Sequence, residues 1–279
     1  MSEIPKIFYD NDTIFHYCNS SVAVENILYE KQLRLTSRKK SNDPIENLPN
    51  KIFDSISAYP EDIQELKKTT AKSFEKIENN IKSRIKNIKQ VCFCMNDKKI
   101  NLNTQSKEYF GFLKPRMWDQ YGDNYKGICL AFSKSELLKD QKIKLKKNIV
   151  YLNYKKLEQQ NIDLDRNEIN EIGYKKYNKI SINYIDKTFF RKHLDYKGEN
   201  EYRICTMCEN EYDYIGIEKS IIGIIVCPEH INAYTCEKLT EYANDMNIEL
   251  LYITWKNDGV TVNKELHSSN FKIIFKHIK

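Results

Sequence analysis

The segment from Ile221 to Cys227 constrains the fold most strongly, because every residue in it except Gly223 carries an apolar side chain. A strand that is apolar on both sides belongs in a sheet that is covered on both faces. Pro228 follows directly and has no N–H to donate to a neighbouring strand, so it ends the segment. The sequence therefore predicts a central strand that is buried on both faces.

The rest of the chain mixes short apolar or alternating segments with long amphipathic ones, which predicts an α+β fold with about seven or eight strands around one core. No stretch rich in proline and glycine divides the chain, so we expect a single domain over residues 1–279, with helical insertions at about 54–90 and 160–193. Further strands are expected at 13–18, 33–36, 91–95, 127–132, 149–154, 249–254 and 271–275, and helices at 20–31, 60–90, 165–193 and 231–247.

The net charge of the chain is mildly positive, with 45 lysines and arginines against 39 acids. Such an excess permits binding to nucleic acid but does not require it, since phosphate contacts need a clustered basic patch. The two long helical segments carry many lysines, which is a hint of such a patch. A run of charge on a helix is more often an ordinary solvated face.

The first twelve residues are polar, and no apolar run follows that would suit a signal peptide or a membrane span. We therefore expect a cytoplasmic protein without a membrane partner, and its eight cysteines as reduced thiols. The pairs Cys92-x-Cys94 and Cys205-x-x-Cys208 lie in expected strands without flanking glycines, so they are not predicted to bind zinc, and no metal site is expected. With only eight glycines, the chain also lacks the G-x-G-x-x-G dinucleotide fingerprint.

Residues 199–206 alternate in a way that predicts a strand with a charged face. Glu199, Glu201 and Arg203 fall on one side, and Tyr202 and Ile204 fall on the other. Two interpretations are open: a solvated edge strand with a cross-strand ion pair, or an acidic site with its own cation. Spacing alone favours the edge strand, because surface ion pairs outnumber active sites.

Several short motifs follow one another along the chain: I-F-H-Y at 14–17, S-N-D-P-x-E at 41–46, V-C-F-C at 91–94, M-W-D-Q-Y-G at 117–122, K-G-I-C-L-A-F at 126–132, E-N-E-Y-R-I at 199–204 and S-I-I-G-I-I-V at 220–226. Taken in this order, they resemble a bacterial protein family of unknown function, domain-of-unknown-function 2971. The resemblance covers most of the chain and leaves the long helical segments between motifs.

A looser resemblance concerns the first strand, which carries His16 and Tyr17 and is followed by a helix and a short strand. This order is similar to the opening of ADP-ribosyltransferase-like folds, which include toxins that modify DNA bases and the tRNA 2′-phosphotransferases. The resemblance implies a core of two small packed sheets with NAD in the cleft between them.

The same resemblance implies roles for particular residues. His16 would contact the adenosine ribose, Tyr121 or Tyr17 would stack on nicotinamide, and the serine expected on the second core strand would be Ser37 or absent. Glu201 or Glu199 would bond the nicotinamide ribose. Arg203 would keep that carboxylate ionised and aimed, or would bind a pyrophosphate oxygen.

Three functions are compatible with these features. The first is an NAD-consuming transferase that modifies a macromolecule, nucleic acid or protein, in a toxin or phage-defence context, with an antitoxin or another regulatory partner. The second is a non-catalytic sensor or binding module of the same fold. The third is a nuclease with Glu46, Glu199 and Glu201 as metal ligands.

Overall fold

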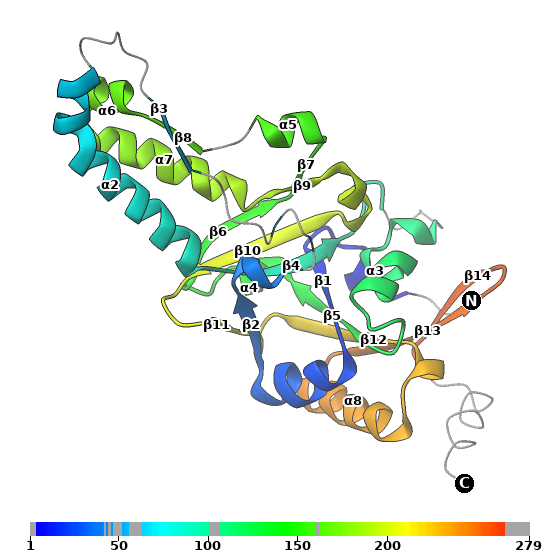
Figure 1. The fold of residues 1–279 in the computed structure, drawn as a ribbon. Helices are drawn as coiled ribbons and strands as arrows, with labels where there is room; N and C mark the ends of the chain where they lie inside the picture. The colour runs from blue at the N-terminus through cyan, green and yellow to red at the C-terminus, as the bar shows by residue number, and fades with distance from the viewer. Residues whose placement is uncertain are drawn as a thin grey trace.

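A computed structural model describes residues 4–41, 43, 46, 52–55, 63–100, 106–159 and 162–265. Its centre is a ten-stranded, mostly antiparallel sheet, in the order β11-β2-β4-β1-β5-β12-β13-β14, with β10 paired to β4 and to β6. Figure 1 shows α2, α6 and α7 together at one end of the molecule and α8 at the other.

The strands of this sheet are β1 (Thr13–Cys18), β2 (Gln32–Thr36), β4 (Ile88–Met95), β5 (Ile128–Ser133), β6 (Ile143–Asn148), β10 (Glu201–Met207), β11 (Tyr212–Gly216), β12 (Ile221–Val226), β13 (Glu249–Lys256) and β14 (Gly259–Asn263). Two small parallel sheets pair β3 (Ile52–Ser55) with β8 (Ile162–Asp165), and β7 (Val150–Leu152) with β9 (Arg191–His193). The α-helices are α2 (Ile63–Asn87), α3 (Pro115–Gln120), α4 (Lys134–Leu137), α5 (Tyr154–Glu158), α6 (Arg166–Ile172), α7 (Tyr174–Thr188) and α8 (Ala233–Met246).

The predicted central strand is confirmed as β12, which lies between β5 and β13. On one face, Ile224 and Val226 pack in a first core with Leu239 of α8 and Ile27 of the π-helix η2 (Val22–Leu28). On the other face, Ile225 packs in a second core that also holds Trp118 of α3 and several phenylalanines. The sheet is therefore covered on both faces, as the apolar sequence of β12 requires.

Two strands, β2 and β1, pair with different parts of one edge of β4, which we call the forked edge. Along its other edge, β4 pairs with β10 from Ile88 to Cys94. On the forked edge it pairs with β2 at Gln90 and with β1 at Cys94 and Met95. Between these two contacts β1 and β2 diverge, so the sheet opens along the middle of β4.

The α+β class is confirmed. The core was expected to consist of two small packed sheets, but it contains one large forked sheet instead. The two arms of the fork stay joined because β4 pairs with strands of both arms. The helical insertion also differs in detail. The helix expected at 165–193 is divided into α6 and α7 at Gly173, whose φ of 80° lies in the left-handed region that favours glycine.

The insertion has a third core of its own. Ile81 of α2 and Ile185 of α7 are fully buried there, together with Phe189 and with Cys205 of β10, so the helices pack directly against the sheet. The ion pair of Arg84 with Asp186 joins α2 to α7 through two hydrogen bonds of 2.6 and 2.7 Å.

The strands expected at 13–18, 33–36, 91–95, 127–132 and 249–254 and the helices expected at 20–31 and 231–247 are confirmed within a few residues. The helix expected to reach residue 90 ends at Asn87, and Ile88 begins β4. The strand expected at 149–154 is the three-residue β7, preceded by β6. The strand expected at 271–275 lies outside the described residues. In the described part of the chain, no helix has the length and apolar character to cross a membrane.

Candidate functional site

The fork in the sheet opens into a cavity of about 590 Å³. Its walls come from β1, η2, β2, the free edge of β4, the end of α3, β9 and the start of β10. Among the lining residues are His16, Ser37, Tyr121, Lys192, Glu199 and Glu201. Residues that are far apart in the sequence are thus brought to one place.

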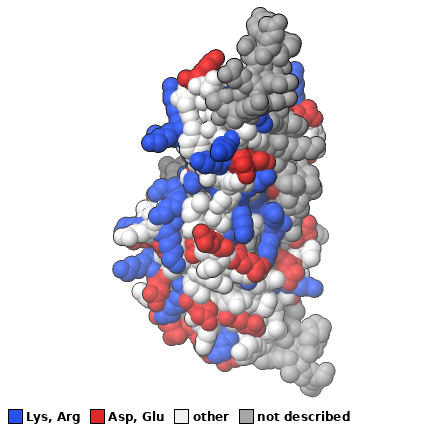
Figure 2. Space-filling model, turned by 60° about the vertical axis from the view of Figure 1, so that its left-hand side comes forward, with Lys and Arg blue, Asp and Glu red and all other residues white. Residues whose placement is uncertain are grey.

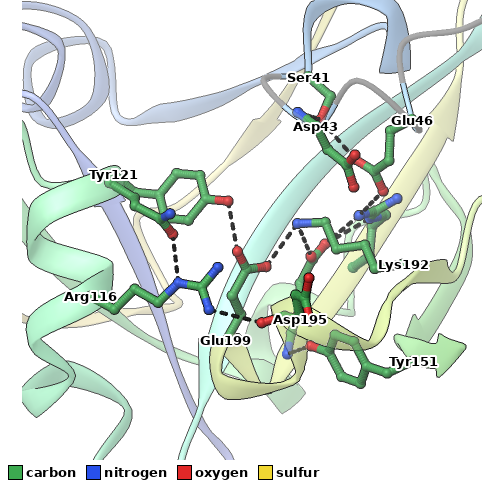
Figure 3. Close-up of polar contacts among 12 residues, drawn as sticks. Ser41, Asp43, Glu46, Arg116, Tyr121, Tyr151, Lys192, Asp195 and Glu199 are labelled. Atoms are coloured by element: carbon green, nitrogen blue, oxygen red, sulfur yellow. Dashed lines mark hydrogen bonds and ion pairs between the residues drawn. The ribbon is translucent and has the colours of Figure 1, made fainter. Parts of the chain in front are cut away.

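The two glutamates on the cavity wall share one lysine (Figure 3). Lys192 Nζ lies 2.7 Å from Glu199 Oε2 and 3.0 Å from Glu201 Oε2. All three residues are buried, with exposed fractions of 5 % for Lys192, 2 % for Glu199 and 3 % for Glu201. In such surroundings two adjacent carboxylates ionise together only if a cation stands between them, and Lys192 is that cation.

Arg203 joins Glu201 to a third acid that lines the cavity, Glu46. Its Nε and Nη2 each lie 2.7 Å from Glu201 Oε1, and Nη2 also lies 2.7 Å from Glu46 Oε1. Its Nη1 donates to the Phe189 carbonyl at 2.6 Å and to Gln90 Oε1 at 3.4 Å. Arg203 is fully buried, and every nitrogen of its guanidinium is engaged. This arrangement suits a group that aims Glu201, and leaves Arg203 no donor for a pyrophosphate oxygen.

The interpretation of this segment as a solvated edge strand is wrong. The alternation itself holds, since Glu201 and Arg203 share one face of β10 while Tyr202 and Ile204 pack in the first core. However, β10 lies between β4 and β6, so it is not an edge, and its charged face is covered by the insertion and by β9.

Glu199 reaches the same cluster from outside the strand. It is the last residue of the 3₁₀-helix η6 (Leu194–Glu199), and Asn200 then turns the chain with a left-handed φ of 46°. The Asn200 amide donates to the carbonyls of Met95 and Asn96 at 3.2 and 2.8 Å, which ties this turn to the end of β4.

Two cations of the segment before α3 and within it hold η6 in place. Lys114 Nζ donates to the Gly198 carbonyl at 3.0 Å, and Arg116 Nη1 donates to the Asp195 carbonyl at 2.8 Å. The same segment supplies Tyr121, whose hydroxyl donates to Glu199 Oε1 at 2.7 Å. Glu199 is therefore fixed from two directions, by Tyr121 and by Lys192.

The surroundings move the pKa values of the two glutamates in opposite directions. Burial raises the pKa of Glu199, and Lys192 and Tyr121 offset only part of that effect. Burial would also raise the pKa of Glu201, but Arg203 and Lys192 outweigh it and lower that pKa. For Lys192, burial is outweighed by the carboxylates of Glu201 and Glu199, which raise its pKa and keep it charged. A pair of acids with divergent pKa values is typical of a division between a proton-transferring acid and a permanently ionised one.

His16 bridges the fork. Its Nδ1 lies 2.9 Å from the carbonyl of Cys92, on the free edge of β4. Burial lowers the pKa of His16, and the Cys92 carbonyl acts in the opposite direction with less effect. The neutral imidazole therefore carries its proton on Nδ1 and donates it to Cys92, which leaves Nε2 as a hydrogen-bond acceptor at the cavity.

Tyr17 and Tyr121 differ in what they offer the cavity. The Tyr17 hydroxyl donates to the Gly111 carbonyl at 2.7 Å, and its ring packs edge-on against Trp118 in the second core. With 7 % of Tyr17 exposed, its ring offers no stacking surface, because the core already covers it. Tyr121 is half-buried on the cavity wall and offers the aromatic surface that Tyr17 does not.

Ser37 follows β2 directly and caps the short 3₁₀-helix η3 (Arg38–Lys40) by accepting a hydrogen bond from the N–H of Lys39 at 3.4 Å. In the part of the chain that the structure describes, its hydroxyl proton has no acceptor, so Ser37 can donate at the cavity.

Sequence reasoning missed Lys192 and Tyr151. Lys192 was expected in a helix. No local pattern marks it, because its partners Glu199 and Glu201 approach it only after the chain has turned through η6. Tyr151 of β7 accepts the Glu201 N–H at 2.8 Å, a contact between elements that no spacing predicts. Within the described residues, no group of three or more His, Cys, Asp or Glu side chains is placed to hold a metal ion.

The protein is thus of the α+β class, with a forked sheet beside a buried row of alternating charges. This row consists of Glu199, Lys192, Glu201, Arg203 and Glu46. The model of a family of unknown function, DUF2971, matches residues 117–204. The predicted resemblance to this family is confirmed over that part of the chain, which holds Tyr121, Lys192, Glu199, Glu201 and Arg203. Comparison with curated proteins and with solved structures finds no match.

Proposed function

We propose that this chain cleaves the bond between nicotinamide and ribose in NAD and transfers ADP-ribose to a macromolecule, in a toxin or phage-defence context. The observation that carries the proposal is the pair of buried carboxylates, Glu199 and Glu201, on the wall of one cavity, with pKa values moved in opposite directions. The cavity volume of about 590 Å³ falls within the range of ligand pockets.

Glu201 suits the first step. When nicotinamide leaves with the bonding electron pair, positive charge develops on the ribose, as it does in glycoside hydrolysis. A carboxylate that is already ionised and fixed stabilises this charge without reorganisation. Arg203 and Lys192 give Glu201 both properties.

Glu199 suits the second step. An acceptor hydroxyl or amine attacks the ribose carbon and loses its proton as the new bond forms. A carboxylate with a raised pKa is the better base for that proton. Tyr121 holds Glu199 through one oxygen and Lys192 through the other.

The remaining cavity residues suit the binding of the rest of NAD. Nε2 of His16 accepts a hydrogen bond, as a ribose hydroxyl requires, and Ser37 offers a donor on the adjacent arm of the fork. Arg34 also lines the cavity and brings positive charge for a pyrophosphate, whereas Lys40 on the same wall already pairs with Glu211.

The test is the release of nicotinamide from NAD by the purified chain, alone and with DNA, RNA or cell lysate. We expect release with one of the additives, and its loss in Glu201→Gln. Glu136→Gln is the matched control, because the ion pair of Glu136 among the described residues is with the exposed Lys139. Unchanged turnover in both Glu201→Gln and Glu199→Gln would contradict the proposal. Release of nicotinamide without any additive would indicate an NAD hydrolase instead.

A second candidate is the non-catalytic binding module. It is favoured by one observation: both oxygens of Glu201 already face cations, and the residue is almost fully buried. A module of this kind would bind a ligand in the cavity and release no nicotinamide under any condition. The nuclease gains no support, because Lys192 stands between Glu199 and Glu201 and Arg203 binds Glu46.

A further inference from the structure

The positive charge of the chain is concentrated in its helical insertion. The three helices α2, α6 and α7 contain 12 lysines and arginines against 6 acids, and this excess equals the net charge of +6 of the whole chain. The remainder of the chain therefore carries equal numbers of basic and acidic residues. On the face drawn in Figure 2, Lys and Arg side chains extend from the upper part of the molecule to its middle, and Asp and Glu are more frequent in the lower part.

The helix α7 carries an uninterrupted polar stripe along its outer face. Its members are all exposed and recur at helical spacing, while Tyr177, Ser181 and Ile185 are buried on the opposite face. The stripe spans roughly 16 Å at a rise of about 1.5 Å per residue. We call it the α7 stripe, and it consists of Lys176, Lys179, Asn183 and Lys187.

The α7 stripe lacks the compensation that a solvated lysine face usually has. The single acid of α7, Asp186, points inward and binds Arg84. Among the described residues, none of the three stripe lysines forms an ion pair, whereas Lys82 of α2 pairs with Glu78 at 2.7 Å. Lys176 and Lys179 lie three residues apart, and like charges at that spacing destabilise a helix slightly, so the stripe is a small cost to the fold.

We propose that the α7 stripe binds the phosphate backbone of a nucleic acid. Each strand of a duplex carries one phosphate per about 3.4 Å of the helix axis, so a stripe laid along that axis spans roughly five phosphates of one strand. The amide of Asn183 adds a neutral donor between the lysines, and the exposed Ile180 lies beside them. A polyanion of regular spacing matches this surface in both charge and length.

The stripe also leads directly to the candidate site. The helix α7 ends at Thr188, the carbonyl of Phe189 accepts from Arg203, and Lys192 follows on β9. A nucleic acid on α7 therefore lies next to the segment that supplies Lys192. That nucleic acid is the acceptor of ADP-ribose rests on the proposed transferase function. The binding of nucleic acid to the stripe does not require that chemistry.

The test is the fluorescence anisotropy of labelled single-stranded DNA and RNA 20-mers and of the DNA duplex, titrated with the full chain at 0.05–0.3 M salt. The variant replaces Lys176, Lys179 and Lys187 with glutamine, which keeps helix propensity. Three lost phosphate contacts weaken single-strand binding about 100-fold at 0.1 M salt, and they reduce the salt slope by about two.

The matched control replaces Lys139, Lys238 and Lys264 with glutamine, which removes the same charge from exposed ion pairs outside the insertion. We expect its affinity to stay within about threefold of the unmodified chain. Equal weakening in both variants, no binding at low salt, or competition by polyglutamate as strong as by nucleic acid overturns the proposal.

The two proposals fail separately. Glu201→Gln retains nucleic-acid binding if the α7 stripe is the binding surface, whatever happens to nicotinamide release. If the unmodified chain binds nucleic acid through the stripe but releases no nicotinamide, the proposed function fails and this inference stands. Circular dichroism melting of each variant checks whether the fold is intact.

Discussion

The ammonium of Lys192 lies 2.7 Å from the carboxylate of Glu199, and both groups are almost fully buried beside a cavity. The same ammonium lies 3.0 Å from Glu201, so one cation serves two adjacent acids. The rest of the site depends on this relationship, because without Lys192 the two carboxylates would repel each other in a poorly solvated place.

Lys192→Met should destabilise the fold strongly at pH 7, because removal of one partner from a buried ion pair leaves uncompensated charge. The typical loss is about 3–5 kcal/mol in the free energy of unfolding. Urea unfolding at pH 7 and pH 5 measures it. The loss should be smaller at pH 5, since without Lys192 the pKa of the paired glutamates rises and protonation relieves their repulsion. Lys238→Met, which removes an exposed pair, should leave the stability unchanged.

Glu201→Gln should change how stability depends on pH. The pKa of Glu201 in the folded state lies below the ordinary value of 4.5, so its ionisation stabilises the fold above that pH. This stabilisation is lost as the pH falls below 4.5 through the folded-state pKa. The stability difference between the unmodified chain and Glu201→Gln should therefore shrink between pH 5 and pH 3 in urea titrations. A difference that stays constant across this range contradicts the role given to Arg203 and Lys192.

Tyr121→Phe should shift the acidic limb of nicotinamide release or transfer to higher pH. The Tyr121 hydroxyl lowers the pKa of Glu199, so its removal raises that pKa further above 4.5. The phenylalanine ring keeps the aromatic surface at the cavity wall. A pH–rate profile of kcat/KM for the two proteins measures the shift, and identical profiles would show that Glu199 does not titrate during the reaction.

His16→Ala should weaken both the fold and the affinity for NAD. Loss of the imidazole leaves the Cys92 carbonyl without its donor, which typically costs about 1–3 kcal/mol. It also removes the Nε2 acceptor from the cavity, so KM for NAD should rise more than kcat falls. His16→Gln, which keeps a donor and an acceptor, should recover part of both effects. A change in stability alone would limit His16 to a structural role.

The parts of the fold that depend on neighbours along the chain were predictable. The apolar sequence of β12 follows from burial on both faces, and the alternation in β10 follows from the pleat of a strand. Glu199 and Glu201 alternate on one face of the expected strand, but spacing alone favoured a solvated edge strand, and they became candidates through the resemblance to ADP-ribosyltransferase-like folds.

The parts that depend on distant pairing were not predictable. The sequence continues helical spacing through Ile81, Ile85 and Ile88, yet Ile88 begins β4 because it pairs with Met207 of β10. Likewise, the burial of Arg203 depends on Glu46, which is 157 residues away in the chain. Periodicity carries no information about such contacts.

The fork in the sheet has a mechanical consequence. The arm that contains β2 and β11 and the arm that contains β1, β5 and β12 are hydrogen-bonded to each other through β4. A molecule bound between β1 and β2 contacts both arms at once and connects them across the opening in the sheet. Filling of the cavity would therefore stiffen the two arms as one body, so that occupancy is transmitted to strands that the ligand never touches.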